Sequence, residues 1–286
     1  MSDTRSGPGD DRGRAAATPI TTADGQAQTA AQPLTTRAVA ALARVPTAWL
    51  LLGQLMVALL VAGTVVWFLQ RCWFPTIGDA IRRLPQQGAL RSGVLEWQDS
   101  SPVCLAEGRF LAVVVDLDHV GQARSPAQVQ VEFGRRDFKV YSLLGAAQRA
   151  YPRNGVVPFN RIELGPWWGA WAPAILAIAA ATVVAGLMVS WVCLATLYCL
   201  PAWLIGFFAN RDCSLGGTWR LSGAALTPGA LLLSGVIVLY GWGALDLVRL
   251  AVGWVAHLVV GWVCLFLSIL SLPRHQRASV KTNPFA

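Results

Sequence analysis

Charged residues are scarce in this sequence: they make up 13% of its 286 residues, whereas an ordinary soluble domain contains about 25%. Four stretches, 45–70, 164–210, 221–245 and 250–273, contain no Asp, Glu, Lys or Arg. A helix needs roughly 20 apolar residues to cross the hydrocarbon core of a bilayer. Each stretch is long enough, so the sequence predicts an integral membrane protein.

The apolar stretches also lack the short alternating segments that are typical of membrane β-barrels. A backbone group without a hydrogen-bond partner costs several kcal/mol in hydrocarbon, so stretches of this kind must be helices. The predicted fold class is therefore an α-helical integral membrane protein with four spans. A small α+β extracytoplasmic domain is inserted between spans 1 and 2.

Lysine is almost absent, because Lys139 and Lys281 are the only two among the 23 basic residues. The arginines are scattered and do not form a patch interleaved with aromatic residues, which argues against a nucleic-acid partner. The six cysteines contain no CxxC pair and no metal-ligand spacing. Cys72 and Cys104 lie outside the apolar stretches, and whether they form a disulfide in an oxidising compartment stays open.

Catalytic motifs are missing too: we find no P-loop, GxSxG, HExxH or dinucleotide fingerprint. The cluster of metal-ligand types is "DLDH", with Asp116, Asp118 and His119. On a strand the two aspartates would share one face, and two carboxylates with an imidazole suit a divalent cation. No further ligand pair stands out, so we favour a strand that ends in a polar turn. We assign no catalytic, cofactor-binding or metal-binding residue.

The first half of the chain divides into three parts. Residues 1–44 have almost no large apolar side chain, which predicts a disordered cytoplasmic tail. Residues 45–70 form the first transmembrane helix, with tryptophans at both ends, where indole rings prefer the headgroup level. Residues 71–165 form the extracytoplasmic α+β domain. Its expected elements are a short helix at 74–85, with Ile77, Ile81 and Leu84 on one side, and strands at 92–97, 102–108, 109–118, 127–133 and 137–144.

Residues 166–272 are predicted to form a three-helix transmembrane bundle with an interfacial segment at 198–226. The long stretch 164–210 lacks an internal polar hairpin, which favours one span at about 168–197 over two, followed by an apolar interfacial stretch to Phe208. The remaining spans are expected at 228–245 and 252–272, followed by a basic cytoplasmic tail at 273–286.

The dipeptide Thr227-Pro228 predicts the start of the third span. Threonine can cap a helix, and proline fits its first turn because the missing N–H has no partner there. The alternative is a kink inside a span that begins near Leu221.

The arginines orient the bundle. With four spans, the basic residues that flank the membrane share one side, which the positive-inside rule makes cytoplasmic. They are Arg37, Arg44, Arg211, Arg220, Arg274, Arg277 and Lys281. We therefore expect a multi-pass protein of the inner (cytoplasmic) membrane with both termini in the cytoplasm.

His257 is the ionisable residue inside a span, and Gly253 and Gly261 lie on the same helical face. Glycines allow close helix contact, where a neutral histidine can bond a facing carbonyl or hydroxyl group. The alternative role, a proton relay, needs an acidic partner at depth, and the predicted spans contain none. We favour a packing role.

Three segments carry a resemblance to a known family: "AIRRLPQQGALRSGVLEW" at 80–97, "LAVVVDLD" at 111–118 and "WRLSGAALTPGALLL" at 219–233. With the order of parts, they resemble a bacterial membrane-protein family of unknown function. Some members lie in maltodextrin-utilisation gene clusters, and their last three helices are similar to Yip-type membrane proteins. The resemblance implies one span, a small outer domain and three further spans, and it implies no catalytic residues.

Three functions are compatible with these features. The first is a non-enzymatic scaffold or an accessory or regulatory component, whose outer domain binds a membrane or envelope partner. The second is a transport component for a small solute or lipid, although spans without acidic residues and without paired broken helices argue against it. The third is a membrane-anchored hydrolase. The expected partners are the lipid bilayer and a membrane or envelope protein.

Overall fold

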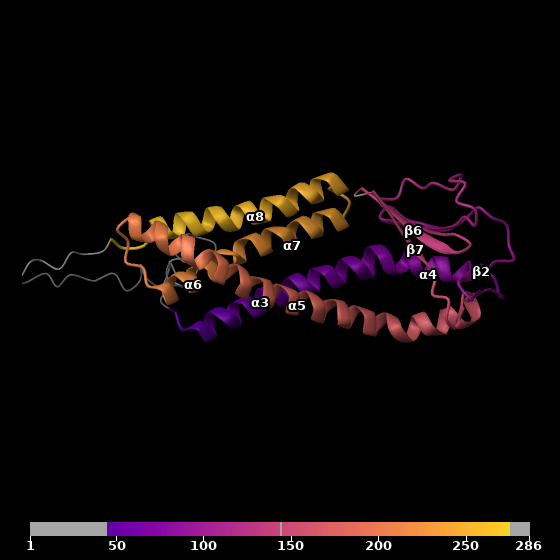
Figure 1. The fold of residues 1–286 in the computed structure, drawn as a ribbon, viewed down its shortest axis with the longest axis horizontal. Helices are drawn as coiled ribbons and strands as arrows, with labels where there is room; N and C mark the ends of the chain where they lie inside the picture. The colour runs from indigo at the N-terminus through magenta and orange to yellow at the C-terminus, as the bar shows by residue number, and fades with distance from the viewer. Residues whose placement is uncertain (1–44, 144, 275–286) are drawn as a thin grey trace, which may run out of the picture.

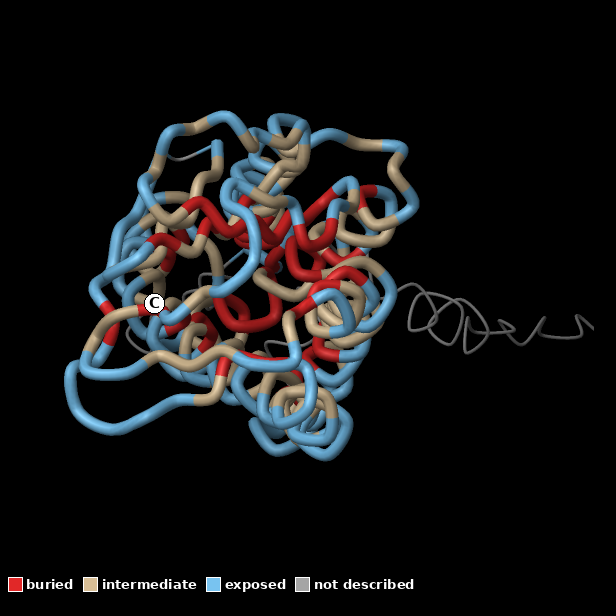
Figure 2. The backbone as a smooth tube through the Cα atoms, turned by 90° about the vertical axis from the view of Figure 1, so that its right-hand side faces the viewer, coloured by how far each residue is buried: buried red, intermediate tan, exposed pale blue. Residues whose placement is uncertain are grey.

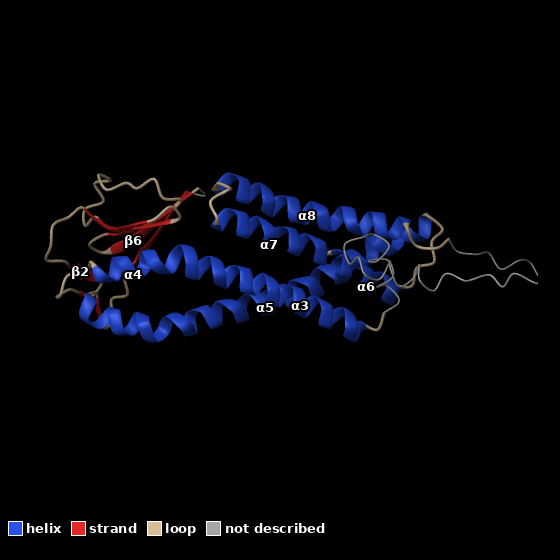
Figure 3. Cartoon of the chain, turned by 180° about the vertical axis from the view of Figure 1, so that it is seen from behind, coloured by secondary structure: helices blue, strands red, loops and turns tan. Residues whose placement is uncertain are grey.

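The computed structural model describes residues 45–143 and 145–274. The predicted tail at 1–44 and residues 275–286 of the predicted basic tail lie outside them. Within this part, four helices are long and apolar enough to cross a membrane: Thr47–Arg82, Arg161–Phe208, Leu215–Gly241 and Leu247–Leu270. An α+β region, residues 74–160, lies between the first two (Figures 1 and 3). This order of elements is the predicted one.

The first long helix does not stop at Gln70, as we predicted. It consists of α3 (Thr47–Phe68), a π-helical turn η1 (Leu69–Trp73) and α4 (Phe74–Arg82), and the residues at both junctions have right-handed helical dihedral angles. Pro75 has no N–H to donate to the preceding turn, and the helix widens just before this residue. The separate short helix that we expected is therefore the end of the first apolar helix.

Two sheets make up the rest of the α+β region. The larger has the order β3-β4-β5-β6-β7, with β4 and β5 parallel and the other pairs antiparallel. The smaller, antiparallel sheet has the order β2-β1-β8. The strands are β1 (Ala89–Arg91), β2 (Val94–Glu96), β3 (Val103–Glu107), β4 (Leu111–Val115), β5 (Val129–Phe133), β6 (Asp137–Ser142), β7 (Gly145–Ala150) and β8 (Val156–Pro158).

The five predicted strands are confirmed as β2 to β6, whereas β1, β7 and β8 were missed. The sequence of β7, "GAAQRA", has no apolar alternation, and all of its residues are exposed. Helix α4 packs against β3 and β4, and Ala80 in this helix and Leu84 just after it are buried in the core of this region. Ile77, Ile81 and Leu84 line one apolar cavity of about 280 Å³, which confirms that they share a face.

Helix α5 (Arg161–Phe208) is a single helix of 48 residues, so the interpretation as one helix rather than two is confirmed. It begins inside the α+β region, where the Asn160 side chain accepts a hydrogen bond of 2.9 Å from the Glu163 N–H. It continues through three prolines to Phe208, so the stretch after residue 197 extends the helix. The helices α3–α4 and α5 thus both extend from the helical bundle directly to the α+β region (Figure 1).

Helices α6 (Leu215–Ala225) and α7 (Thr227–Gly241) follow each other with only Leu226 between them. Pro228 lies in the first turn of α7, as predicted, but Thr227 does not cap it, and Leu226 has helical dihedral angles. The cap lies further upstream, where Ser214 accepts a hydrogen bond of 3.1 Å from the Gly217 N–H. The break at Thr227-Pro228 therefore interrupts a longer helix, which agrees better with the alternative of a kink.

Helix α8 (Leu247–Leu270) packs against α7 through glycines. A β-carbon on Gly229 would collide with the carbonyl oxygen of His257, and one on Gly253 would lie 2.6 Å from the Val236 side chain. The predicted packing of the glycine face of α8 is confirmed. The expected partner of His257 on a facing helix is wrong, because its Nδ1 contacts the carbonyl oxygen of Trp254 in its own helix.

Buried residues lie near the long axis of the molecule and exposed residues surround them (Figure 2). Among the helices, Leu221 and Ile269 are almost fully buried, and the side-chain amide of Gln54 donates a buried hydrogen bond of 3.0 Å to the Gly223 carbonyl. Cys72 and Cys104 are both free thiols, so the open question of a disulfide is answered in the negative for this structure.

The close contact of α7 with α8 yields a first prediction. In Gly229→Ala the new methyl group meets the backbone of His257, and only a shift of α7 relieves this contact. We expect the free energy of unfolding to fall by about 1–3 kcal/mol. A β-carbon on Gly235 in the same helix would have nothing within 4 Å, so Gly235→Ala is the matched control and should be neutral or stabilising, by up to about 1 kcal/mol. Thermal unfolding in detergent measures both, and equal melting temperatures would contradict the packing.

Candidate functional site

The segment 116–128 connects β4 to its parallel neighbour β5 and carries the predicted "DLDH" residues. It runs across the face of β5 that bears Gln130 and Glu132. These two polar side chains are buried, with 5% and 2% of their surface exposed. The polar face of β5 is thus covered by the 116–128 connection, which precedes this strand in the sequence.

The three "DLDH" residues do not converge. Strand β4 ends at Val115 and runs into a turn that contains Asp118, so the favoured interpretation of a strand that ends in a polar turn is confirmed, and Asp116 and Asp118 do not share a strand face. Asp116 is 1% exposed and accepts a hydrogen bond of 2.8 Å from the Gly121 N–H. The Asp118 side chain is 71% exposed and lies 3.6 Å from Arg135. In the part of the chain that the structure describes, no three ligand side chains group as a metal site would require.

His119 is held between two carboxylates. Its Nδ1 lies 2.5 Å from Glu132 and its Nε2 lies 2.6 Å from Asp137. Burial is the largest influence on the imidazole and lowers its pKa, but the hydrogen bonds to Glu132 and Asp137 outweigh it, so the pKa of His119 lies above its usual value. Burial likewise raises the pKa of Asp137, but hydrogen bonds from His119 and Gln148 outweigh it, so the net pKa is lowered.

This arrangement fixes the covering segment to the sheet. A protonated imidazole donates from both nitrogens and gives the buried Glu132 carboxylate a cationic partner, beside the hydrogen bond of 3.3 Å that this carboxylate accepts from the Gln130 side chain. A β-carbon on Gly134 would collide with His119 Nε2, so the ring needs a glycine beside it. With both nitrogens engaged, His119 has no free lone pair with which to accept a proton as a general base.

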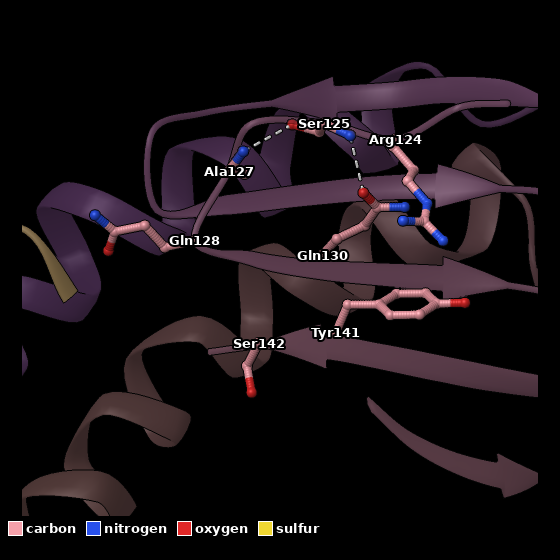
Figure 4. Close-up of a pocket in the computed structure, with 7 residues that line it drawn as sticks. All are labelled: Arg124, Ser125, Ala127, Gln128, Gln130, Tyr141 and Ser142. Carbon is pink, nitrogen blue, oxygen red and sulfur yellow. Dashed lines mark hydrogen bonds between the residues drawn. The ribbon is translucent and has the colours of Figure 1, made fainter. Parts of the chain in front are cut away.

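A polar pocket of about 180 Å³ opens beside this cluster (Figure 4). We call it the polar pocket, and its described lining residues are Arg124, Ser125, Ala127, Gln128, Gln130, Tyr141 and Ser142. Short hydrogen bonds shape its rim: the Ser125 N–H donates to Gln130 at 2.9 Å, and the Ala127 N–H donates to Ser125 Oγ at 3.1 Å.

Arg124 alone is charged among these lining residues. Its side chain is exposed, and it forms no ion pair with any residue that the structure describes. In Figure 4 its side chain runs from the 116–128 connection towards the strand that carries Tyr141. The polar pocket therefore presents an uncompensated guanidinium group, which suits an anionic ligand.

An apolar cleft of about 580 Å³ adjoins the polar pocket, and Ser142 lines both. We call it the apolar cleft; its lining residues are Val129, Ser142, Leu143, Leu233, Ile237, Leu247, Leu250, Ala251 and Trp254. It lies between the end of the larger sheet and the surfaces of α7 and α8. Tyr240 of α7 contacts Gln128, so the helices reach the rim of the polar pocket.

None of the residues that line the polar pocket was predicted as a site residue from the sequence. Arg124, Gln128 and Tyr141 come from the 116–128 connection and from β6, and they meet because Gln130 pairs with Tyr141 in the sheet. No motif marks them, since strand register follows from packing as well as from the local pattern.

Another polar cavity, of about 340 Å³, lies at the opposite end of the helices between Asp212 and Leu272. Arg220 lines it, and the Nε atoms of Arg211 and Arg220 are buried and have no hydrogen-bond partner among the described residues. These arginines are two of those that the sequence placed beside the membrane.

The His119 cluster predicts a pH dependence. Because its pKa is raised in the folded state, its stabilisation is complete below about pH 6.5 and is lost as the pH rises through the folded-state value. We expect the melting temperature of the full chain to fall over this range, and His119→Asn to remove that component and to cost about 3–5 kcal/mol, since Glu132 loses its cationic partner. Melting of both proteins in detergent across pH 5–9 tests this. An identical slope in the variant would show that His119 is not the responsible group.

The chain was compared with known proteins at the levels of family, sequence and structure. No family model, no curated protein and no solved structure matches it. The role of the site therefore rests on its geometry.

Proposed function

We propose that this protein is a non-enzymatic accessory or scaffold component of a bacterial inner membrane, whose α+β region lies outside the cytoplasm and binds an envelope component at the membrane surface. The observation that carries the proposal is the direct helical connection between the apolar helices and the region that contains the polar pocket. Two apolar helices, α3–α4 and α5, run without interruption into the region that holds it. A pocket on such a support keeps a fixed height and orientation relative to the bilayer.

The two alternative functions have less support. In a hydrolase with its site in this region, His119 would be the natural base, but both of its ring nitrogens face carboxylates. For a transport component, the cavity lined by His257 is about 90 Å³ and mostly apolar. That size and lining suit a packing gap better than a solute pathway.

The orientation follows from charge. The start of α3 and the end of α8 lie at the same end of the bundle, opposite the α+β region (Figure 1). Arg211 and Arg274 pair through their backbones at that end, with Arg220 nearby. The positive-inside rule places this end in the cytoplasm. The resemblance to the bacterial family with one span, an outer domain and three spans supports the same arrangement.

Topology gives a direct prediction. A reporter enzyme that is active only outside the cytoplasm, fused after Ala286, should be inactive, and the same reporter inserted at Gln98 in the exposed β2–β3 loop should be active. Both fusions are made in the full chain and normalised to the amount of protein in the membrane. Activity after Ala286 would overturn the orientation.

Binding at the polar pocket has its own prediction. A photo-reactive amino acid at Tyr141, which lines the polar pocket, should form adducts with an envelope component in intact cells. The same amino acid at Gln98, which is exposed on the α+β region away from the polar pocket, is the matched control and should form few. Mass spectrometry identifies the adducts. Equal labelling at both positions, or solute flux through liposomes that contain the purified protein, would contradict the proposal.

A further inference from the structure

We propose that the polar pocket and the apolar cleft together hold one anionic phospholipid, with its phosphate at Arg124 and its acyl chains along α7 and α8. This inference rests on the proposed function, because it names the envelope component and needs the helices to lie in a bilayer. It goes further by specifying the ligand class and the residues that select it.

The headgroup part of the site is built for a phosphate. The Arg124 guanidinium has no carboxylate partner among the described residues, and arginine binds phosphate through paired charge-assisted hydrogen bonds. Tyr141 and Gln128 line the same polar pocket and add a hydroxyl and an amide, which suit the polar groups of a glycerol-type headgroup.

The acyl-chain part is built for hydrocarbon. Eight of the nine described residues that line the apolar cleft are apolar, and the exception is Ser142, where the cleft meets the polar pocket. Leu143 is 55% exposed and Trp254 is 56% exposed, one on each side of it. An apolar surface of this kind is unfavourable when it is exposed to water, whereas beside a bilayer an acyl chain can cover it.

The two parts form one amphipathic site. Gln128 lines the polar pocket and its neighbour Val129 lines the apolar cleft, while Ser142 belongs to both. The change from polar to apolar lining therefore occurs within one residue, as the polar and apolar parts of a phospholipid also adjoin. A free phosphate ion would fill only the polar pocket and leave the apolar cleft uncovered.

The charge of the site selects the headgroup. Arg124 is the charged lining residue, so a lipid with net negative charge gains the full attraction. A zwitterionic lipid also carries a positive charge in its headgroup, and this charge offsets part of the attraction to Arg124. We therefore expect phosphatidylglycerol to be preferred over phosphatidylcholine.

The test uses the full chain in detergent with equal amounts of phosphatidylglycerol and phosphatidylcholine, and native mass spectrometry to count retained lipids. Arg124→Gln should reduce the preference for phosphatidylglycerol about tenfold, the loss expected for a strong charge-assisted contact. Arg153→Gln removes an exposed arginine of the α+β region outside both cavities and should leave the preference unchanged. An unchanged preference in Arg124→Gln would overturn the inference.

A second arm separates a lipid from a free anion. Ala251→Trp fills the apolar cleft and should reduce retention of both lipids, and Leu143→Ser tests the opposite wall if that variant unfolds. Excess inorganic phosphate should not displace phosphatidylglycerol. Displacement by phosphate together with no effect of either cleft variant would identify a free-anion pocket and refute the lipid site. Protein adducts at position 141 without any lipid preference would refute this inference while leaving the proposed function intact.

Discussion

The placement of the whole molecule depends on the continuous helical path of its first long helix, Thr47–Arg82. Over 36 residues this helix changes environment, from apolar packing against α5 and α7 to the core of the α+β region. In a bilayer a helix must satisfy its own backbone groups, so ending it at the membrane surface would require caps. Continuing it through a π-turn past Pro75 avoids this requirement. The last turns then bring Ile77 and Ala80 to the core beside the sheet, so that one element sets the position of the bundle and of the α+β region together.

A buried polar layer has the same organising role inside the α+β region. Strand β5 turns its apolar residues towards α4 and its polar residues Gln130 and Glu132 towards the 116–128 connection. A buried carboxylate costs several kcal/mol unless it is paired, and His119 provides that pairing while it also reaches Asp137. The contacts of His119 with Glu132 and Asp137 therefore fix the position of the 116–128 connection on the sheet. As a consequence, Arg124 and Gln128, which lie further along the same segment, are positioned at the polar pocket.

The features that could be predicted from the sequence are those for which a physical constraint acts on the local composition of the chain. The length of an apolar stretch needed in a bilayer identified all four long helices, and β-branched strands such as β4 were found from their pattern. The predictions were wrong where tertiary packing overrode a local sequence pattern. Gln70 marks the end of the apolar stretch but not of the helix, and Thr227-Pro228 has the residues of a helix start but follows α6 directly. The polar pocket could not be predicted, because its residues meet only through the pairing of Gln130 with Tyr141.

The unequal lengths of the helices explain why a polar and an apolar cavity meet. Helices α3–α4 and α5 continue into the α+β region, whereas α7 ends at Gly241 and α8 begins at Leu247, so both stop short of the sheet along the long axis of the molecule (Figure 1). Arg109 spans this step, donating a hydrogen bond of 3.4 Å to the Leu245 carbonyl. The sheet end thus projects over the tops of two apolar helices. Sheet residues that must face water and helix residues that must avoid it then adjoin along one line, and a ligand that fits this line has to be amphipathic.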